Sequence, residues 1–180
     1  QVWSTLNQEL QILADTFDAA LLAWGNKLGL KKLILLSSSM VYENAILMPS
    51  LEEDVGFIPP PNSTYGFQKL MAEYWAKGAY EQYGLPCTII RPFNCVGVGE
   101  DKAIEIGNEK ITLSHVLPDF IAKALKKDNP FKILGSGNQT RCLTNGKDTA
   151  RGIRLAMESN TTNIFNISTQ ESITMENLAR

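Results

Sequence analysis

Several kinds of residue and segment are scarce in this sequence, and each scarcity excludes a class of protein. The 180 residues include one His and three Cys without paired C-x-x-C spacing, so we predict neither a metal site nor a redox motif. No apolar run approaches the roughly 18 residues needed to cross a bilayer, and the N-terminus lacks the pattern of a signal peptide. We therefore expect a cytoplasmic protein with no membrane partner.

The sequence also lacks an excess of charge of either sign. It has 17 Lys and Arg against 19 Asp and Glu, a formal net charge of −2, and its basic residues are scattered. Nucleic-acid binding is therefore not predicted. A hydrophobic fraction of 44% is enough for a buried core, which excludes intrinsic disorder as the main state.

Short apolar runs alternate with longer helical patterns along the chain. The runs predict strands over residues 33–36, 87–91, 131–134 and 163–167. Apolar residues at three- and four-residue steps predict helices over residues 6–24, 65–83, 114–127 and 148–158. Strands that are apolar on both faces and alternate with helices predict an α/β fold with a doubly wound parallel sheet.

The two ends of the sequence have helical patterns that are not complete. The first residues already read as the inside of a helix, and Thr174 opens a second helix that stops after about two turns. We therefore expect an N- and C-terminally truncated chain. Between the first strand and the second long helix, Pro49, Pro59, Pro60 and Pro61 predict an irregular loop.

Three consecutive serines follow the first predicted strand, in the segment Ser37-Ser38-Ser39-Met40-Val41-Tyr42. Sheets of parallel strands carry their ligand sites at the carboxyl ends of the strands, so a hydroxyl here is placed to meet a ligand. Serines at a strand end also satisfy backbone groups, and taken alone the triplet favours that simpler role.

A tyrosine and a lysine open the helix after the proline-rich loop, in Tyr65-Gly66-Phe67-Gln68-Lys69. Their spacing places both side chains on one helix face, within reach of one bound molecule. Tyrosine is a poor base at neutral pH, but an ammonium and a cationic nicotinamide ring favour the phenolate, which can accept a proton as a hydride leaves. The alternative is an ordinary helix in which Lys69 pairs with Glu73.

Two further motifs follow in order, Arg91-Pro92-Phe93-Asn94-Cys95-Val96-Gly97 and Gly135-Ser136-Gly137-Asn138-Gln139-Thr140-Arg141. With the serine triplet and the tyrosine–lysine pair, they give the chain a resemblance to the extended short-chain dehydrogenase/reductase family. More narrowly, the chain resembles the NAD-dependent epimerase/dehydratase group that acts on nucleotide sugars. The resemblance covers nearly the whole chain and implies the C-terminal half of a Rossmann-like doubly wound parallel sheet with a small substrate-binding region.

The resemblance assigns catalytic and cofactor-binding roles to particular positions. Ser38 would hydrogen-bond the sugar oxygen, Tyr65 would be the acid/base, and Lys69 would bind the nicotinamide ribose and favour the phenolate. The residues implied as cofactor contacts are Ser37, Tyr65, Lys69, Pro92 and Phe93. The implied cofactor is NAD, with NADP as the alternative, because the residue that reads the ribose lies outside these motifs.

The same resemblance implies a nucleotide-diphosphate sugar as the bound partner. Asn94 would contact the substrate diphosphate, and Arg141 would pair with its phosphates. His115, the only His, is assigned to the diphosphate at most, since it matches no acid/base position of the family. Leu134 falls where a side chain packs against the nucleotide base.

The sequence departs from the family in its missing glycine-rich turn. The G-x-x-G-x-x-G turn that cradles the cofactor pyrophosphate does not occur anywhere in the chain. The resemblance places that turn upstream of Gln1. We therefore expect the chain by itself to bind NAD poorly and to be inactive.

A second departure bears on the type of reaction. Dehydratases of the family carry an acidic pair after the catalytic position, where this sequence has Ser39 and Met40. Elimination of water needs a general acid at the leaving hydroxyl, so its absence favours an NAD-dependent nucleotide-sugar epimerase. The alternatives are a reductase or 4,6-dehydratase of the same family, or a non-catalytic nucleotide-sugar binding or scaffolding fragment.

The resemblance also implies a division of the chain and an oligomer. Residues 1–93 would belong to the dinucleotide fold, and residues 94–180 would be mainly substrate-binding with some elements returning to the sheet. Members of the family often dimerise through two helices, which correspond here to residues 6–24 and 65–83. A homodimer through these helices is therefore expected.

Overall fold

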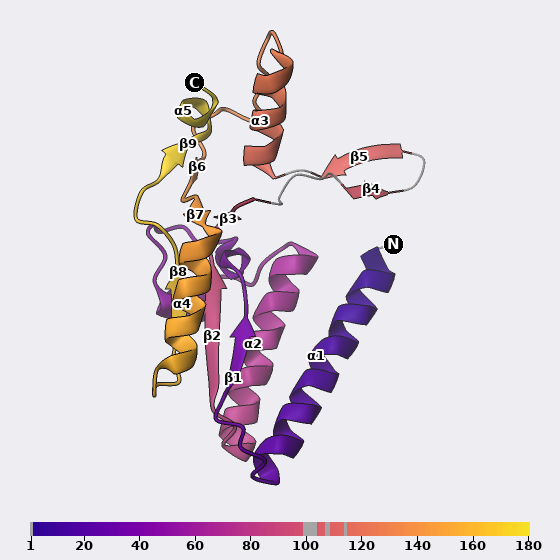
Figure 1. Cartoon of the computed structure of the whole chain (residues 1–180), viewed down its shortest axis with the longest axis vertical. Coiled ribbons are helices and arrows are strands. Elements are labelled where there is room, and N and C mark those ends of the chain that lie inside the picture. The colour runs from indigo at the N-terminus through magenta and orange to yellow at the C-terminus, as the bar shows by residue number, and fades with distance from the viewer. Residues whose placement is uncertain (1, 99–103, 107–108, 114) are drawn as a thin grey trace. The chain divides into compact units, whose positions relative to one another are not determined.

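The computed structural model describes the backbone of residues 2–98, 104–106, 109–113 and 115–180 (Figure 1). The chain divides into two compact units. The first unit comprises Gln1–Pro92 and Gly152–Ile167, and the second comprises Phe93–Arg151 and Ser168–Arg180.

The helices and strands of the described residues alternate along the chain. The helices are α1 (Val2–Gly25), η1 (Ser39–Tyr42), η2 (Glu52–Gly56), α2 (Thr64–Tyr83), α3 (Val116–Lys126), α4 (Gly146–Glu158) and α5 (Met175–Ala179), of which η1 and η2 are short 3-10 helices. The strands are β1 (Leu33–Leu36), β2 (Cys87–Pro92), β3 (Cys95–Val96), β4 (Ile104–Ile106), β5 (Glu109–Leu113), β6 (Thr140–Arg141), β7 (Thr144–Asn145), β8 (Ile164–Ile167) and β9 (Ile173–Thr174). None of the helices in this part of the chain is long and apolar enough to span a membrane.

The first unit is built on a parallel sheet in the order β1-β2-β8. Leu33 pairs with Cys87 at one end of the β1–β2 ladder, and Ile89 pairs with Ile164 in the β2–β8 ladder. In Figure 1, β1 lies in front of α2, whereas α4 covers β8. This arrangement confirms the predicted α/β class with a parallel sheet.

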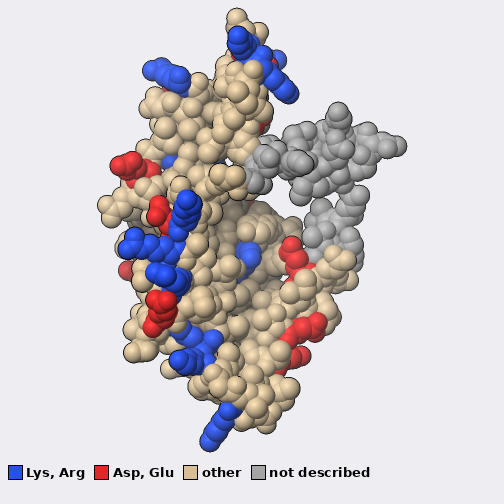
Figure 2. All heavy atoms as spheres, viewed as in Figure 1, with Lys and Arg blue, Asp and Glu red and all other residues tan. Residues whose placement is uncertain are grey.

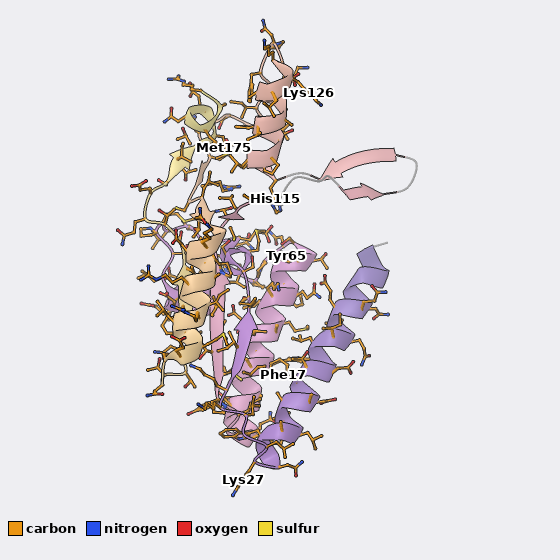
Figure 3. All side chains as sticks on the ribbon, viewed as in Figure 1. Phe17, Lys27, Tyr65, His115, Lys126 and Met175 are labelled. Carbon is orange, nitrogen blue, oxygen red and sulfur yellow. The ribbon has the colours of Figure 1, made fainter. Side chains whose placement is uncertain are left out.

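The core of this unit lies between the sheet and the helices α1 and α2. Its buried side chains are apolar and come from both helices, from β2 and from the connection between α2 and β2: Phe17, Ala20, Ala76, Ala79, Leu85 and Ile89. Figure 3 labels Phe17 where α1 faces α2, and its ring meets the Trp75 ring edge-on at 6.0 Å between centres. Alanines on α2 allow close packing of the helix, and the helix ends at Gly84, whose positive φ of 67° closes its last turn.

A buried ion pair lies in the same unit. Arg91 at the end of β2 and Glu73 on α2 are 1% and 6% exposed. Arg91 donates from Nε to Glu73 Oε1 at 2.9 Å and from Nη2 to Glu73 Oε2 at 2.6 Å. Burial lowers the pKa of Arg91, but the hydrogen bonds and charge of Glu73 and the Tyr42 hydroxyl raise it overall, so the guanidinium stays charged.

The second unit contains small pairs of strands and short helices. β3 pairs with β7 in parallel, while β4 with β5 and β6 with β9 form antiparallel pairs. Phe120 of α3 packs edge-on against Phe131, with 5.3 Å between ring centres. Thr174 caps α5 through its Oγ1, which accepts a hydrogen bond from Asn177 N at 3.1 Å, as its place before the helix predicted.

One predicted strand is wrong. Residues 131–134 form neither a strand nor a helix. A strand needs a partner for its backbone groups, and this segment instead packs Phe131 on α3 and gives the Lys132 carbonyl to Lys123 Nζ at 3.0 Å. The predicted helix over 114–127 begins at Val116, and the expected start at Ser114 lies outside the described residues.

We expect Glu73→Gln to lower the free energy of unfolding by about 3–5 kcal/mol, because it leaves the buried charge of Arg91 without its counter-charge. The matched control is Glu81→Gln, which removes the same charge from an exposed pair with Lys77 on the same helix. That control should cost about 0.5 kcal/mol or less. Urea unfolding followed by circular dichroism measures both losses, and equal losses would contradict the structural importance of the buried pair.

Candidate functional site

Two of the three serines after β1 are buried at the carboxyl end of the strand. Ser37 N donates to Ile90 O at 2.8 Å, which extends the β1–β2 ladder by one bond. Ser37 Oγ donates to Glu73 Oε1. Ser38 Oγ accepts a hydrogen bond from Met40 N at 3.2 Å and so caps η1. Ser37 and Ser38 therefore hydrogen-bond to nearby backbone and side-chain groups, and both lie at the carboxyl end of β1.

Tyr65 and Lys69 lie one turn apart near the N-terminus of α2, whose start Figure 3 marks by the label on Tyr65. Ser63 caps the helix through an Oγ that accepts from Gly66 N at 3.1 Å. Lys69 Nζ lies 5.7 Å from the centre of the Tyr65 ring and donates to Leu36 O at 3.0 Å. The predicted common face is confirmed, and the pair is attached to the last residue of β1.

The alternative expected for this helix, a pair between Lys69 and Glu73, is wrong. The Glu73 carboxylate accepts hydrogen bonds from Arg91 and Ser37, whereas Lys69 turns to the Leu36 carbonyl. The ammonium is therefore not neutralised by the nearest acidic residue on its own helix. Its positive charge stays next to the Tyr65 ring.

A groove of about 350 Å³ runs along α1, β1 and α2 beside this pair. Its walls are mostly apolar, and Tyr65, Gln68 and Lys69 bring polar groups to it. The Tyr65 side chain is half exposed. An apolar hollow with a few placed polar groups is the usual form of a small-molecule site.

Gly66 sets how closely α2 approaches the turn after β1. A Cβ built at this position would lie 2.7 Å from Pro61 Cβ, 2.8 Å from Met40 O and 2.9 Å from Ser63 Oγ. No real side chain fits such distances. The glycine beside Tyr65 thus allows the start of α2 to lie against η1.

The motif after β2 continues into the second unit. Pro92 ends β2 and pairs with Ile167, and Phe93 and Asn94 follow. Asn94 has a positive φ of 37°, and its Nδ2 donates to Cys142 O at 3.3 Å. Asn94 is therefore joined to the segment that directly follows Arg141.

The remaining predicted substrate contacts are exposed in the second unit. His115 precedes α3, Leu134 is 86% exposed, and Arg141 in β6 donates from Nη1 to Thr140 O at 2.8 Å. Basic and acidic side chains both occur over the visible face of the molecule (Figure 2). Among the residues that the structure describes, no cluster of three His, Cys, Asp or Glu could hold a metal ion.

Sequence reasoning missed the role of two residues that support the site. It named Glu73 only as a possible partner of Lys69 and Arg91 only as the start of a motif, whereas in the structure the two residues pair and Glu73 holds Ser37. The sequence did contain a signal, because Arg91 ends an otherwise apolar predicted strand, and a charged residue at a buried position needs a counter-charge.

Comparisons with known proteins identify the family to which this fold belongs. A UDP-N-acetylglucosamine 4-epimerase from Methanobrevibacter ruminantium has the same fold at a TM-score of 0.73 and 29% identity, over 99% of this chain and 55% of its own. A UDP-N-acetyl-alpha-D-glucosaminuronate decarboxylase from Bacillus cytotoxicus is 29% identical over 99% of this chain and 54% of its own length. The model of the NAD dependent epimerase/dehydratase family matches residues 14–168. The chain belongs to this family.

Another similar protein was solved with both a nucleotide sugar and NAD bound. The UDP-glucuronic acid 4-epimerase from Bacillus cereus, solved with UDP-glucuronic acid and NAD, matches at a TM-score of 0.63 and 26% identity, over 81% of this chain and 42% of its own. The chain spans about half the length of the relatives that it matches. NAD is the cofactor of this family.

We expect Gly66→Ala to lower the free energy of unfolding by about 1–3 kcal/mol, because its Cβ would overlap Pro61 and Met40. The control Gly78→Ala lies on the same helix, where an added Cβ would meet only Gln82 Nε2 at 3.9 Å. That variant should raise stability by about 0.5–1 kcal/mol through helix propensity. Urea unfolding distinguishes the two, and a shift of the same sign in both would contradict the close approach at Gly66.

Proposed function

We propose that this chain carries the catalytic tyrosine and lysine of an NAD-dependent nucleotide-sugar epimerase. The proposal rests on one observation: Lys69 donates a hydrogen bond to Leu36 O and lies beside the Tyr65 ring. Leu36 ends the strand that Ser38 follows. The fold neighbours that are UDP-sugar epimerases support the substrate class.

The residues present fit the nicotinamide end of NAD. Lys69 uses one of its three N–H groups on Leu36 O, so two N–H groups can reach ribose hydroxyls. We assign the other cofactor contacts to Tyr65, Pro92, Phe93 and the backbone of Ser37, whose hydroxyl is donated to Glu73. The chain carries no glycine-rich pyrophosphate turn, so we propose that these 180 residues alone bind NAD weakly and are inactive.

The proposed chemistry moves one proton through Tyr65. The chemistry that bound NAD would supply is hydride transfer, from the sugar carbon and back to the other face of the resulting ketone. Tyr65 takes the hydroxyl proton from that carbon's oxygen and gives it back after the sugar has turned. The Lys69 ammonium lies beside the Tyr65 ring, and Ser38 would hold the substrate oxygen by a hydrogen bond.

The second unit supplies the proposed contacts to the nucleotide diphosphate. Arg141 offers a planar, permanently charged group that can bind phosphate oxygens through two N–H donors. Asn94 and His115 are the further polar contacts, and the exposed Leu134 side chain can pack against the base.

A decarboxylase of the same family is the second candidate, and the Bacillus cytotoxicus relative favours it. Both reactions begin in the same way, because a proton leaves a sugar hydroxyl and a hydride leaves the carbon that bears this hydroxyl. They differ in the product, because a decarboxylase releases CO2 from a uronic acid. A reductase would consume NADH, a dehydratase would release water, and a non-catalytic nucleotide-sugar binding or scaffolding protein would turn over none of these substrates.

We expect Tyr65→Phe to lower kcat for epimerisation by about 10²–10⁴-fold with little change in substrate affinity, because only the proton-transferring oxygen is lost. The measurement uses the natural protein that contains this chain, with NAD and UDP-N-acetylglucosamine. Tyr83→Phe removes an exposed hydroxyl at the end of the same helix and should keep wild-type turnover. Unchanged turnover in Tyr65→Phe would overturn the mechanism.

We further propose a homodimer through α1 and α2. Both helices expose large apolar side chains, namely Ile12, Leu22, Phe67, Tyr74 and Tyr80. Burying such side chains against a second copy removes apolar area from water.

Light scattering tests the dimer. We expect the natural protein to have twice its chain mass and Leu22→Asp to reduce it to the monomer, because the charge would enter the interface. Leu47→Asp, which changes an exposed leucine in the loop before η2, should leave the dimer intact. A wild-type monomer would refute this proposal.

A further inference from the structure

Glu73 is buried on α2, and its carboxylate makes contacts beyond its ion pair. Arg91 occupies both of its oxygens through Nε and Nη2. The Ser37 hydroxyl is a third donor to this carboxylate. The two hydrogen bonds from Arg91 fix the position of the Glu73 carboxylate, so the Ser37 hydroxyl donates to a rigid acceptor.

Ser37 lies between two parts of the proposed site. On one side is Leu36, whose carbonyl accepts the hydrogen bond from Lys69 Nζ. On the other side is Ser38, whose Oγ caps η1. Fixing Ser37 therefore fixes both the carbonyl that holds Lys69 and the hydroxyl assigned to the sugar oxygen.

Helix α2 holds this strand end at two points one turn apart. Lys69 donates to Leu36 O, and Glu73 accepts from Ser37 Oγ. Two bonds along the helix axis define an orientation, whereas one bond would allow the turn to pivot.

We infer that Ser37 and Glu73 form a positioning device, in which the carboxylate anchored by Arg91 sets the place of Ser38 and Lys69 relative to Tyr65. This role rests on the proposed function, since it concerns the same reaction. It also differs from the cofactor contact that the sequence resemblance implied for Ser37, because the hydroxyl is committed to Glu73.

A purely structural role would predict something different. If the hydroxyl only stabilised the fold, its loss would lower the unfolding midpoint and weaken the whole unit. A positioning role predicts a local change in the turn and a loss of kcat without a matching loss of substrate affinity.

The test compares Ser37→Ala with Ser39→Ala in the natural protein that contains this chain. Both variants delete one serine hydroxyl, and Ser39 is the first residue of η1. Hydrogen–deuterium exchange reports protection of the amides of residues 38–42, and steady-state kinetics with NAD and UDP-N-acetylglucosamine report kcat and KM. Should Ser37→Ala not fold, Ser37→Cys, nearly equal in size and a weak donor, is judged by the same criteria.

We expect Ser37→Ala to raise exchange of residues 38–42 severalfold and to lower kcat about tenfold, while KM changes by less than about twofold. Ser39→Ala should match the wild type in exchange, kcat and KM. Wild-type kcat and protection in Ser37→Ala would overturn the inference, as would a loss of protection throughout the first unit. A wild type without turnover would refute the proposed function. Hydrogen–deuterium exchange alone would then decide the positioning role: loss of protection confined to residues 38–42 in Ser37→Ala supports it, and unchanged protection there overturns it.

Discussion

The first unit depends on the burial of a guanidinium and a carboxylate in contact. Removing either charge from water costs several kcal/mol, and only close, fully hydrogen-bonded pairing offsets that cost. Arg91 and Glu73 meet this condition with two N–H···O bonds, while Arg91 Nη1 also donates to Glu52 O at 2.8 Å and to Tyr42 Oη. Because the pair tolerates little displacement, β2, α2, η1 and η2 are held in one arrangement.

The same network extends to the third strand of the sheet. The Tyr42 hydroxyl donates to Asn166 Oδ1 at 2.8 Å, and Asn166 N donates to Glu52 Oε1 at 2.8 Å. Burial raises the pKa of the Tyr42 phenol despite the opposing effect of Arg91, so this hydroxyl remains a neutral donor. The buried polar groups of this network thus join η1, η2 and the ends of β2 and β8, whereas the Tyr65 side chain is half exposed.

Sequence patterns predicted those parts of the molecule that depend on local chemistry. Four consecutive apolar residues at Leu33–Leu36 indicated a strand, which forms although its residues are only partly buried and Leu36 is exposed, and four-residue spacing placed Tyr65 and Lys69 on one face. The same reasoning failed for residues 131–134, because composition describes a strand but not whether a neighbouring strand is there to pair with it. The partner of Glu73 was equally hidden, since only the packing of α2 on β2 brings Glu73 and Arg91 together.

The attraction between Lys69 and Tyr65 depends on how far water reaches the pair. Lys69 Nζ lies 5.7 Å from the centre of the Tyr65 ring, and a contact of this kind contributes about 0.5–1 kcal/mol at an exposed site and about 2 kcal/mol once water is excluded. The Tyr65 side chain is half exposed in the groove, so the contact lies at the weak end of this range. In the reaction proposed for this chain, bound molecules would cover the pair, exclude water and strengthen the contact. The apolar side chains of β1 and α1 that line the groove favour this change, because they offer water no hydrogen bonds once the groove is filled, whereas Glu9 and Thr16 of α1 bring polar groups to the same wall.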